Sequence, residues 1–206
     1  MSLFITLEGP EGSGKSSAIN KVYVRLIYEG YEIICTREPG GTPISEQIRN
    51  VILNQENTSM DIRTEALLFA ASRRQHLKEK VWPALEKGKL VFCDRYLDSS
   101  LAYQGHARGL GIDEVLSINL FATENTFPHL TLLFDIDPKI GLERIAANNA
   151  REVNRLDKEK LEFHNKVREG YLILAKRYPE RIVIIDASKS MEEVAEETYR
   201  IIKERL

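Results

Sequence analysis

The sequence predicts an α/β fold in which a parallel five-stranded sheet is covered by helices. Short apolar runs rich in branched residues are typical of strands buried on both faces, and five such runs occur, at residues 3–7, 32–36, 90–93, 130–134 and 182–185. Helical patterns separate these runs, and this alternation is typical of a parallel sheet. Ligands of such folds bind at the carboxyl ends of the strands, so we expect the functional residues there.

The helical patterns set the rest of the expected architecture. The clearest run from residue 61 toward residue 86 and over residues 17–28, 138–148, 158–177 and 190–206. Pro83 should end or kink the long middle helix near Trp82, because proline lacks an N–H and its ring clashes with the preceding turn. No repeat or linker is visible, and 206 residues suffice for one substantial core, so we expect a single domain over residues 1–206.

Composition excludes several classes of protein. The chain is 43% hydrophobic and carries a net charge of −2 without a basic stripe, which argues against nucleic-acid binding. The N-terminus lacks the features of a signal peptide and no apolar run reaches transmembrane length, so we expect a cytoplasmic protein with no membrane partner.

Cys35 and Cys93 show no C-x-x-C spacing. We interpret both as reduced, buried thiols and expect no metal site built from protein ligands alone.

The clearest functional motif lies between the first apolar run and the first helical pattern. Residues 9–16 have the spacing G-x-x-x-x-G-K-S, in which glycines let successive N–H groups turn toward a phosphate at the helix N-terminus. Lys15 would meet the β- and γ-phosphates, and Ser16 would offer its hydroxyl to Mg²⁺. The residues expected to bind ATP are Gly9, Pro10, Glu11, Gly12, Ser13, Gly14, Lys15, Ser16 and Ser17.

Other motifs narrow the class of nucleotide-binding protein. The chain has neither the N-K-x-D motif of signalling GTPases nor the L-S-G-G-Q element of transport ATPases. We therefore expect a small phosphotransferase with a second small-molecule substrate. Asp94 follows the apolar run 90–93, an arrangement that orders Mg²⁺ through its water shell. Arg95 beside it would bridge the donor and acceptor phosphates, with a strand-end salt bridge as the structural alternative.

Two further clusters carry residues suited to a nucleotide. Arg37 and Glu38 open a Pro-Gly-Gly turn that leads into a helix carrying Arg49, and the planar fork of arginine binds two phosphate oxygens at once. A plain turn is the alternative.

Phe69 and Arg73 are four residues apart and share a helix face. An aromatic ring can stack on a base there while a guanidinium reaches its edge, although core packing would explain the same pair.

The last clusters follow residue 98. Ser100, Tyr103 and Gln104 share one face if this segment is helical, and a glutamine amide can pair with the N–H and C=O edge of a pyrimidine. A solvated helix face is the alternative.

The polar stretch 148–155 breaks helical periodicity, and it is either a mobile cover over the site or a surface loop.

Together these strings resemble the bacterial thymidylate kinases, a family of nucleoside monophosphate kinases. The matching stretches are residues 8–16, 36–42, 69–73, 94–105 and 154–157. Residues 36–42 and 94–105 are far more specific for this family than the phosphate loop. The resemblance implies the P-loop fold of nucleoside monophosphate kinases, Mg²⁺-dependent transfer of the γ-phosphate of ATP to dTMP to give dTDP, and a homodimer.

The resemblance also implies how dTMP is bound. Phe69 stacks on thymine, Arg73 reaches a thymine carbonyl, and the remaining polar edge is read by the Ser100 hydroxyl and the Gln104 amide. Arginines hold the phosphate, and Tyr103 packs against the deoxyribose. The residues expected to bind dTMP are Glu11, Arg37, Glu38, Pro39, Arg49, Phe69, Arg73, Arg95, Ser100, Tyr103 and Gln104.

A catalytic cation must come from outside the phosphate loop. Phosphoryl transfer needs positive charge on the moving group, but the loop has no arginine and carries Glu11 instead. We therefore expect a mobile lid around residues 146–157 to supply the arginine. The expected catalytic residues are Lys15, Asp94, Arg95, Arg151 and Arg155, and the expected Mg²⁺ ligands, partly through water, are Ser16 and Asp94.

Two alternative functions stay open. A kinase for another monophosphate, such as dUMP, UMP, CMP or AMP, would use the same phosphate chemistry, and a 5-methyl group contributes only about 1–3 kcal/mol to discrimination. A regulator that binds ATP without turnover is the second alternative. It would tolerate loss of Asp94 and Arg95, and both are present.

Overall fold

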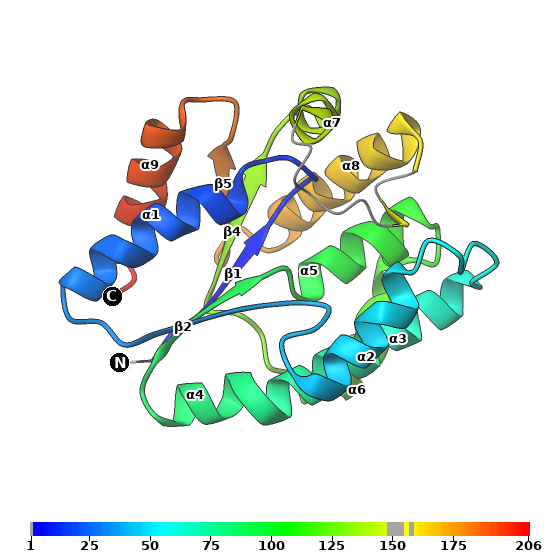
Figure 1. Cartoon of the computed structure of the whole chain (residues 1–206), viewed down its shortest axis with the longest axis horizontal. Helices are drawn as coiled ribbons and strands as arrows, with labels where there is room; N and C mark the ends of the chain where they lie inside the picture. The colour runs from blue at the N-terminus through cyan, green and yellow to red at the C-terminus, as the bar shows by residue number, and fades with distance from the viewer. Residues whose placement is uncertain (1, 148–154, 157–158) are drawn as a thin grey trace.

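The computed structural model describes residues 2–147, 155–156 and 159–206. Its centre is a parallel sheet with the strand order β2-β3-β1-β4-β5 (Figure 1). The strands are β1 (Phe4–Glu8), β2 (Ile33–Arg37), β3 (Leu90–Asp94), β4 (Leu130–Asp135) and β5 (Ile182–Asp186). The predicted α/β class and the five strands are confirmed. Leu7 pairs with Asp94, so the carboxyl ends of β1 and β3 meet at one edge of the sheet.

Burial differs between the central and the edge strands. β1, β3 and β4 are buried almost throughout, whereas β2 and β5 lie at the edges and expose alternate residues. Cys93 on β3 is buried as predicted, but the prediction for Cys35 is wrong because this residue is exposed on β2. An edge strand has a neighbour on one side only, and an apolar run alone does not reveal that position.

Helices cover both faces of the sheet. α1 (Lys15–Tyr28) and α9 (Met191–Lys203) lie side by side on one face (Figure 1), and they pack against the side chains of Phe92 and Leu132. Residues of α4 (Trp82–Glu86) and α8 (Leu161–Arg177) pack on the other face, against Val91 and Leu133. Successive strand residues point to opposite faces, so neighbouring residues enter different cores.

The other α-helices lie near the carboxyl edge and along one flank of the sheet. They are α2 (Pro43–Leu53), α3 (Ile62–His76), α5 (Leu97–Ser100), α6 (Ile112–Thr123) and α7 (Pro138–Ala146). The Asp61 side chain caps α3 by accepting hydrogen bonds from two backbone N–H groups, and Ser190 and Glu193 form a capping box at α9. The sequence patterns did not single out α6. No helix of the described chain is long and apolar enough to span a bilayer.

The helical segment that contains Pro83 does not end at Trp82 but runs on to Glu86. α3 continues into a π-helical turn, η1 (Leu77–Val81), and α4 begins at Trp82 with Pro83 in its first turn. A proline costs least in the first turn, where the N–H has no helical partner. A second π-helical segment, η2 (Leu101–Ala107), continues α5. Such wide turns are rare and are frequently found at functional sites.

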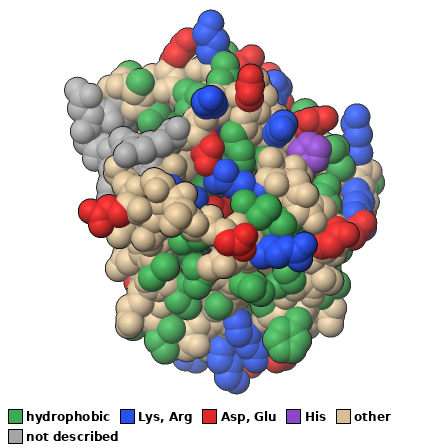
Figure 2. All heavy atoms as spheres, turned by 90° about the vertical axis from the view of Figure 1, so that its right-hand side faces the viewer, with side chains coloured by type: hydrophobic (Ala, Val, Ile, Leu, Met, Phe, Trp, Pro, Cys, Tyr) green, Lys and Arg blue, Asp and Glu red, His purple; other side chains and the backbone are tan. Residues whose placement is uncertain are grey.

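Apolar side chains are exposed on three adjacent helices of one flank. Phe121 on α6 is 90% exposed and Leu67 on α3 is 55% exposed, while Val51 on α2 is 47% exposed. α3 contacts both α2 and α6. Figure 2 views the molecule from the side where α2 and α3 lie in Figure 1, and hydrophobic side chains are frequent in the lower half of the face that it shows.

Candidate active site

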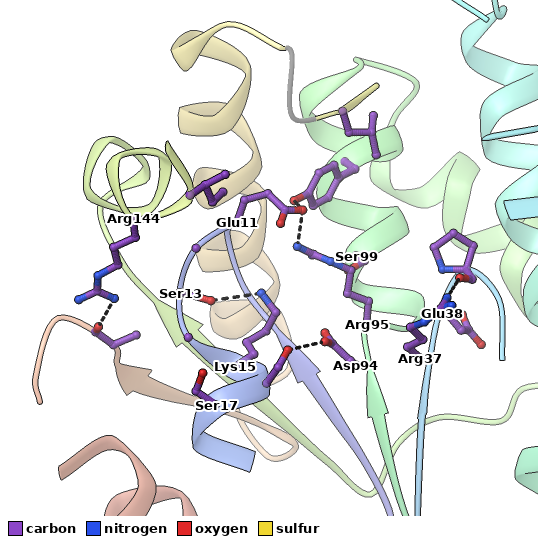
Figure 3. Close-up of a pocket in the computed structure, with 18 of the residues that line it drawn as sticks. Glu11, Ser13, Lys15, Ser17, Arg37, Glu38, Asp94, Arg95, Ser99 and Arg144 are labelled. Carbon is purple, nitrogen blue, oxygen red and sulfur yellow. Dashed lines mark hydrogen bonds and ion pairs between the residues drawn. The ribbon is translucent and has the colours of Figure 1, made fainter. Parts of the chain in front are cut away.

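A cleft of about 770 Å³ lies at the carboxyl edge of the sheet (Figure 3). Its wall is formed by the loop after β1, the segments after β2 and β3, and parts of α3, α7 and η2. The volume is typical of a small-molecule site. Most of the residues predicted from separate sequence clusters line this one cleft.

The phosphate loop depends on glycine for its shape. Gly12 and Gly14 have φ angles of 70° and 81°, in the left-handed region that favours glycine. A Cβ on Gly12 would lie 2.1 Å from the carbonyl oxygen of Gly141 on α7, and a Cβ on Gly141 would lie 2.2 Å from the carbonyl oxygen of Glu11. The loop and α7 therefore touch through their backbones. Sequence reasoning missed Gly141, because a glycine inside a helical pattern gives no indication of its partner.

Lys15 is folded against its own loop. Its Nζ donates hydrogen bonds to the carbonyl oxygens of Gly9 (3.1 Å) and Pro10 (3.0 Å) and to Ser13 Oγ (3.2 Å). Burial and the charge of Arg95 lower the pKa of Lys15 to about 8. A phosphate in the loop would offset both effects by adding negative charge beside the ammonium group.

Ser16 and Asp94 fit the predicted magnesium site. Ser16 Oγ donates a hydrogen bond to Asp94 Oδ2 at 3.2 Å (Figure 3). Asp94 Oδ1 is buried and has no hydrogen-bond partner in the part of the chain that the structure describes. A buried carboxylate oxygen without a partner is costly. A hydroxyl and a carboxylate are oxygen donors that suit Mg²⁺ with its retained waters, and a water-coordinated cation would satisfy Oδ1.

Arg95 is held over the cleft by three side chains. Its backbone has a φ of 66°, uncommon for a residue other than glycine. Nη2 pairs with Glu11 Oε1 at 2.7 Å, and Nη1 donates to Tyr171 Oη (3.0 Å) and Ser99 Oγ (3.2 Å). Figure 3 shows Arg95 reaching across the cleft toward Glu11 on the phosphate loop. The guanidinium is thus tied to the phosphate loop through Glu11 and to α5 and α8 through Ser99 and Tyr171.

Glu8 supports Arg95 indirectly, through two hydroxyl groups that contact both residues. Sequence reasoning gave Glu8 no role. Glu8 Oε2 accepts hydrogen bonds from Ser99 Oγ (2.6 Å) and Tyr171 Oη (2.9 Å), the two hydroxyls that also meet Arg95. Glu8 Oε1 accepts from the Tyr96 N–H at 2.7 Å. Burial and the charge of Asp98 raise the pKa of Glu8 to about 7. Glu8 could have been noticed in the sequence as a charged residue at the end of a buried strand, but nothing in the sequence points to Tyr171.

The turn after β2 brings two arginines together. The Glu38–Pro39 peptide bond is cis. The carbonyl oxygen of Pro39 accepts hydrogen bonds from Arg37 Nη1 (3.0 Å) and Arg49 Nη1 (2.9 Å). Arg37 also pairs with Glu46 at 3.0 Å. Both guanidinium groups line the cleft, so the predicted phosphate-binding cluster is assembled.

Arg73 lies behind the cleft wall. It is 1% exposed, and its Nε pairs with Glu38 Oε2 at 2.7 Å. Its Nη1 donates to Ser100 Oγ (3.1 Å) and contacts Asn119 Oδ1, and Nη2 donates to the carbonyl oxygen of Tyr96 (2.9 Å). Contact of Arg73 with a thymine carbonyl stays a prediction. In this structure Arg73 orients Ser100, which does line the cleft.

The structure also groups Glu38, His76 and Cys93, whose candidate ligand atoms lie within 4.8 Å of one another. His76 Nδ1 is already hydrogen-bonded to Glu38 Oε1 (2.8 Å) and His76 Nε2 to Thr36 Oγ1 (2.7 Å). Because both ring nitrogens and the carboxylate have partners, the cluster is satisfied as a buried hydrogen-bonded network. We assign it no metal.

Four of the residues predicted to bind the base or the deoxyribose of dTMP line the cleft, and we call this part of its lining the base-binding wall. They are Phe69, Ser100, Tyr103 and Gln104. The helical conformation on which this prediction depended is present, but from Leu101 it is π-helical. Gln104 is 1% exposed, and its Nε2 donates to Glu65 Oε1 at 2.9 Å.

The two predicted lid arginines have different outcomes. Arg151 and most of the segment 146–157 lie outside the described residues. Arg155 is described and does not line the cleft. Its Nη2 pairs with Glu65 Oε2 at 2.5 Å and its Nε donates to the carbonyl oxygen of Ile52 at 3.0 Å. Its catalytic role stays a prediction, and its observed partners lie on the side of α2 and α3.

Comparison with known proteins decides the family. The thymidylate kinase family model matches residues 7–198. The chain belongs to the thymidylate kinase family. A thymidylate kinase of Bacillus pumilus (strain SAFR-032) is 59% identical, covering 99% of this chain and 96% of its own. One of Clostridium novyi (strain NT) is also 59% identical, covering 97% and 98% respectively. The crystal structure of thymidylate kinase from Ehrlichia chaffeensis superposes with a TM-score of 0.78 at 30% identity, covering 98% of each chain. The resemblance inferred from the motifs and the P-loop monophosphate kinase fold are confirmed.

The raised pKa of Glu8 predicts an unusual dependence of stability on pH. Its folded-state pKa of about 7 exceeds the ordinary value of 4.5, so the folded chain holds this proton more tightly than the unfolded chain. The contribution of Glu8 to the free energy of unfolding should therefore fall as pH rises from about 4.5 to about 7. In urea denaturation, the stability of the wild type relative to Glu8→Gln should decrease over that window. Parallel curves for the two proteins, or a relative gain with rising pH, would contradict the assignment.

Proposed function

We propose that this chain transfers the γ-phosphate of ATP to dTMP, giving dTDP and ADP. One observation carries the proposal. The phosphate loop with Lys15 and a separate set of arginines, Arg37, Arg49 and Arg95, face the same cleft, beside the wall formed by Phe69 and Gln104. A site with two phosphate-binding halves and one base-binding wall suits a donor triphosphate and an acceptor monophosphate. Membership in the thymidylate kinase family identifies that acceptor as dTMP.

The donor half would bind ATP with Mg²⁺. The loop N–H groups and the N-terminus of α1 would hold the phosphates, and Lys15 would turn from its loop carbonyls to the β- and γ-phosphates. Ser16 and Asp94 would hold Mg²⁺, partly through water, and the metal would neutralise charge on the transferred group. Arg95 would stabilise the same charge from the acceptor side.

The acceptor half would bind dTMP beside α3 and η2. Phe69 would stack on thymine, and Ser100 and Gln104 would meet its polar edge. Arg49 and Arg95 would bind the phosphate bidentately, with Arg37 beside them. Tyr103 Oη approaches Glu11 Oε1 at 3.4 Å, and this proximity supports a deoxyribose site beside the two residues.

The first test is ADP release from ATP and Mg²⁺ by the purified protein. It is measured with dTMP, dUMP, UMP, CMP, AMP and GMP at matched concentrations. We expect dTMP to lead by about tenfold or more, which corresponds to about 1.4 kcal/mol in the transition state. A different leading monophosphate would overturn the base-binding assignments but keep the phosphate assignments. Stoichiometric ATP binding with no ADP release in any reaction would favour the alternative of a non-catalytic regulator.

The lid arginine is tested by separate Arg151→Ala and Arg155→Ala variants. At least one should lose kcat with a modest change in KM, because an arginine that meets the moving phosphoryl group acts mainly in the transition state. Since Arg155 pairs with Glu65 here, we expect Arg151→Ala to show the loss, on the order of 10³-fold. Wild-type turnover in both variants would remove the lid proposal.

We also propose that the enzyme is a cytoplasmic homodimer. The exposed side chains of Val51, Leu67 and Phe121 on three adjacent helices support a dimer interface on that flank. Sedimentation should give twice the chain mass of 23.6 kDa for the wild type. Phe121→Asp should dissociate the dimer, because it places a charge in the apolar contact. Tyr28→Asp on α1, where the tyrosine is 88% exposed, is the matched control and should stay dimeric. A monomeric wild type would refute the proposal.

A further inference from the structure

The amide of Gln104 is held by a carboxylate that lies outside the cleft wall. Glu65 is on α3, four residues before Phe69, and is 1% exposed. Its Oε1 accepts the hydrogen bond from Gln104 Nε2 at 2.9 Å. No described residue donates a hydrogen bond to Gln104 Oε1. Gln104 lines the cleft. Its carbonyl oxygen is therefore the amide atom that can accept a hydrogen bond from a ligand.

An ionised carboxylate allows only one orientation of this amide. It accepts hydrogen bonds and cannot donate, so the NH₂ end of Gln104 must face Glu65 and the carbonyl end must face away. Burial opposes the charge of Glu65, but the hydrogen bond from Gln104 and two nearby guanidinium groups outweigh burial and lower the pKa of this carboxyl. Glu65 is thus a fixed acceptor at neutral pH.

The two guanidinium groups also prevent Glu65 from turning away. Arg155 Nη2 pairs with Glu65 Oε2 at 2.5 Å, on the oxygen not used by Gln104. Arg108 Nε approaches Glu65 Oε1 at 3.4 Å. Arg108 is itself anchored by Glu159 at 2.7 Å and by the Phe163 ring, whose centroid lies 4.5 Å from its guanidinium carbon. Both carboxylate oxygens are therefore fixed from behind the base-binding wall.

We propose that Glu65 is a positioning residue that sets base specificity by holding Gln104 Oε1 toward the acceptor base. A fixed carbonyl oxygen can accept from the N3–H of thymine or uracil. It repels cytosine, whose N3 is itself an acceptor with no proton to donate. The inference rests on the proposed function, because it requires a pyrimidine monophosphate in this half of the cleft.

The test is Glu65→Gln, a substitution that keeps shape but adds a donor. Arginine only donates, so both arginines favour the carbonyl oxygen of the new amide. The 2.5 Å contact of Arg155 at the Oε2 position outweighs the 3.4 Å contact of Arg108 at the Oε1 position, so the carbonyl oxygen should stay at Oε2 and the new NH₂ group should replace Oε1. Gln104 would then turn its carbonyl toward position 65 and present NH₂ to the cleft. We expect kcat/KM for dTMP to fall about tenfold and kcat/KM for dCMP to rise, with KM for ATP unchanged.

The readout is the ratio of kcat/KM for dTMP to that for dCMP on one preparation. The fraction of folded enzyme cancels in this ratio, so a loss of stability alone cannot move it. Arg108→Gln is the matched control, since it removes another partner of Glu65 but leaves the Gln104 hydrogen bond, and it should keep the wild-type ratio.

A double variant, Glu65→Gln with Gln104→Glu, tests the orientation directly. It should recover the preference for dTMP. The carboxylate introduced at position 104 can accept a hydrogen bond from the amide introduced at position 65, and it still presents an oxygen to the cleft.

The outcomes separate this inference from the proposed function. If wild-type enzyme phosphorylates dTMP but Glu65→Gln keeps the wild-type ratio, or loses activity equally on both substrates, Glu65 has no role in base selection. If the double variant fails to recover the preference for dTMP, orientation of the side chain at position 104 does not explain the effect. If the wild type shows no activity with dTMP, the proposed function itself has failed.

Discussion

The pairing of buried charges at one edge of the sheet is the constraint on which the site depends. A site for two phosphate-bearing substrates needs several cations partly removed from water, and an unpaired buried charge costs several kcal/mol. The chain meets this requirement with neighbouring acids and polar oxygens. Arg95 is paired with Glu11, Arg73 with Glu38, and Lys15 with the carbonyls of its own loop. The positive groups are therefore held in place by partners within the chain.

This arrangement explains why so many elements contribute to one cleft. Glu8 ends β1, Arg95 follows β3 and Tyr171 lies on α8, yet they form one hydrogen-bonded unit. A parallel sheet brings the carboxyl ends of its strands to the same edge, and helices crossing back over the sheet deliver side chains from distant parts of the chain. Residues that line the cleft are thus held by a layer of residues whose positions depend on the fold rather than on a motif.

That distinction decides how much could be predicted from the sequence. The phosphate loop, Asp94 and Phe69 come from local patterns, and each lines the cleft. Arg73, four residues after Phe69, is buried behind the cleft wall. The support of Arg95 by Tyr171 and of Gln104 by Glu65 joins residues far apart in the sequence, so no spacing encodes it. The exposure of Cys35 depends on strand order, and no sequence pattern marks the π-helical turn before Pro83. Family resemblance supplied residue roles but not these supporting contacts.

The contact between the phosphate loop and α7 has an evolutionary consequence. Gly12 and Gly141 are far apart in the chain, yet the backbone of each segment occupies the space that a methyl group on the other segment's glycine would need. Neither position can acquire a side chain by drift unless the loop and α7 separate. The helix after β4 therefore cannot be exchanged independently of the phosphate loop when segments of related enzymes are recombined, and a functional chimera must inherit both glycines together.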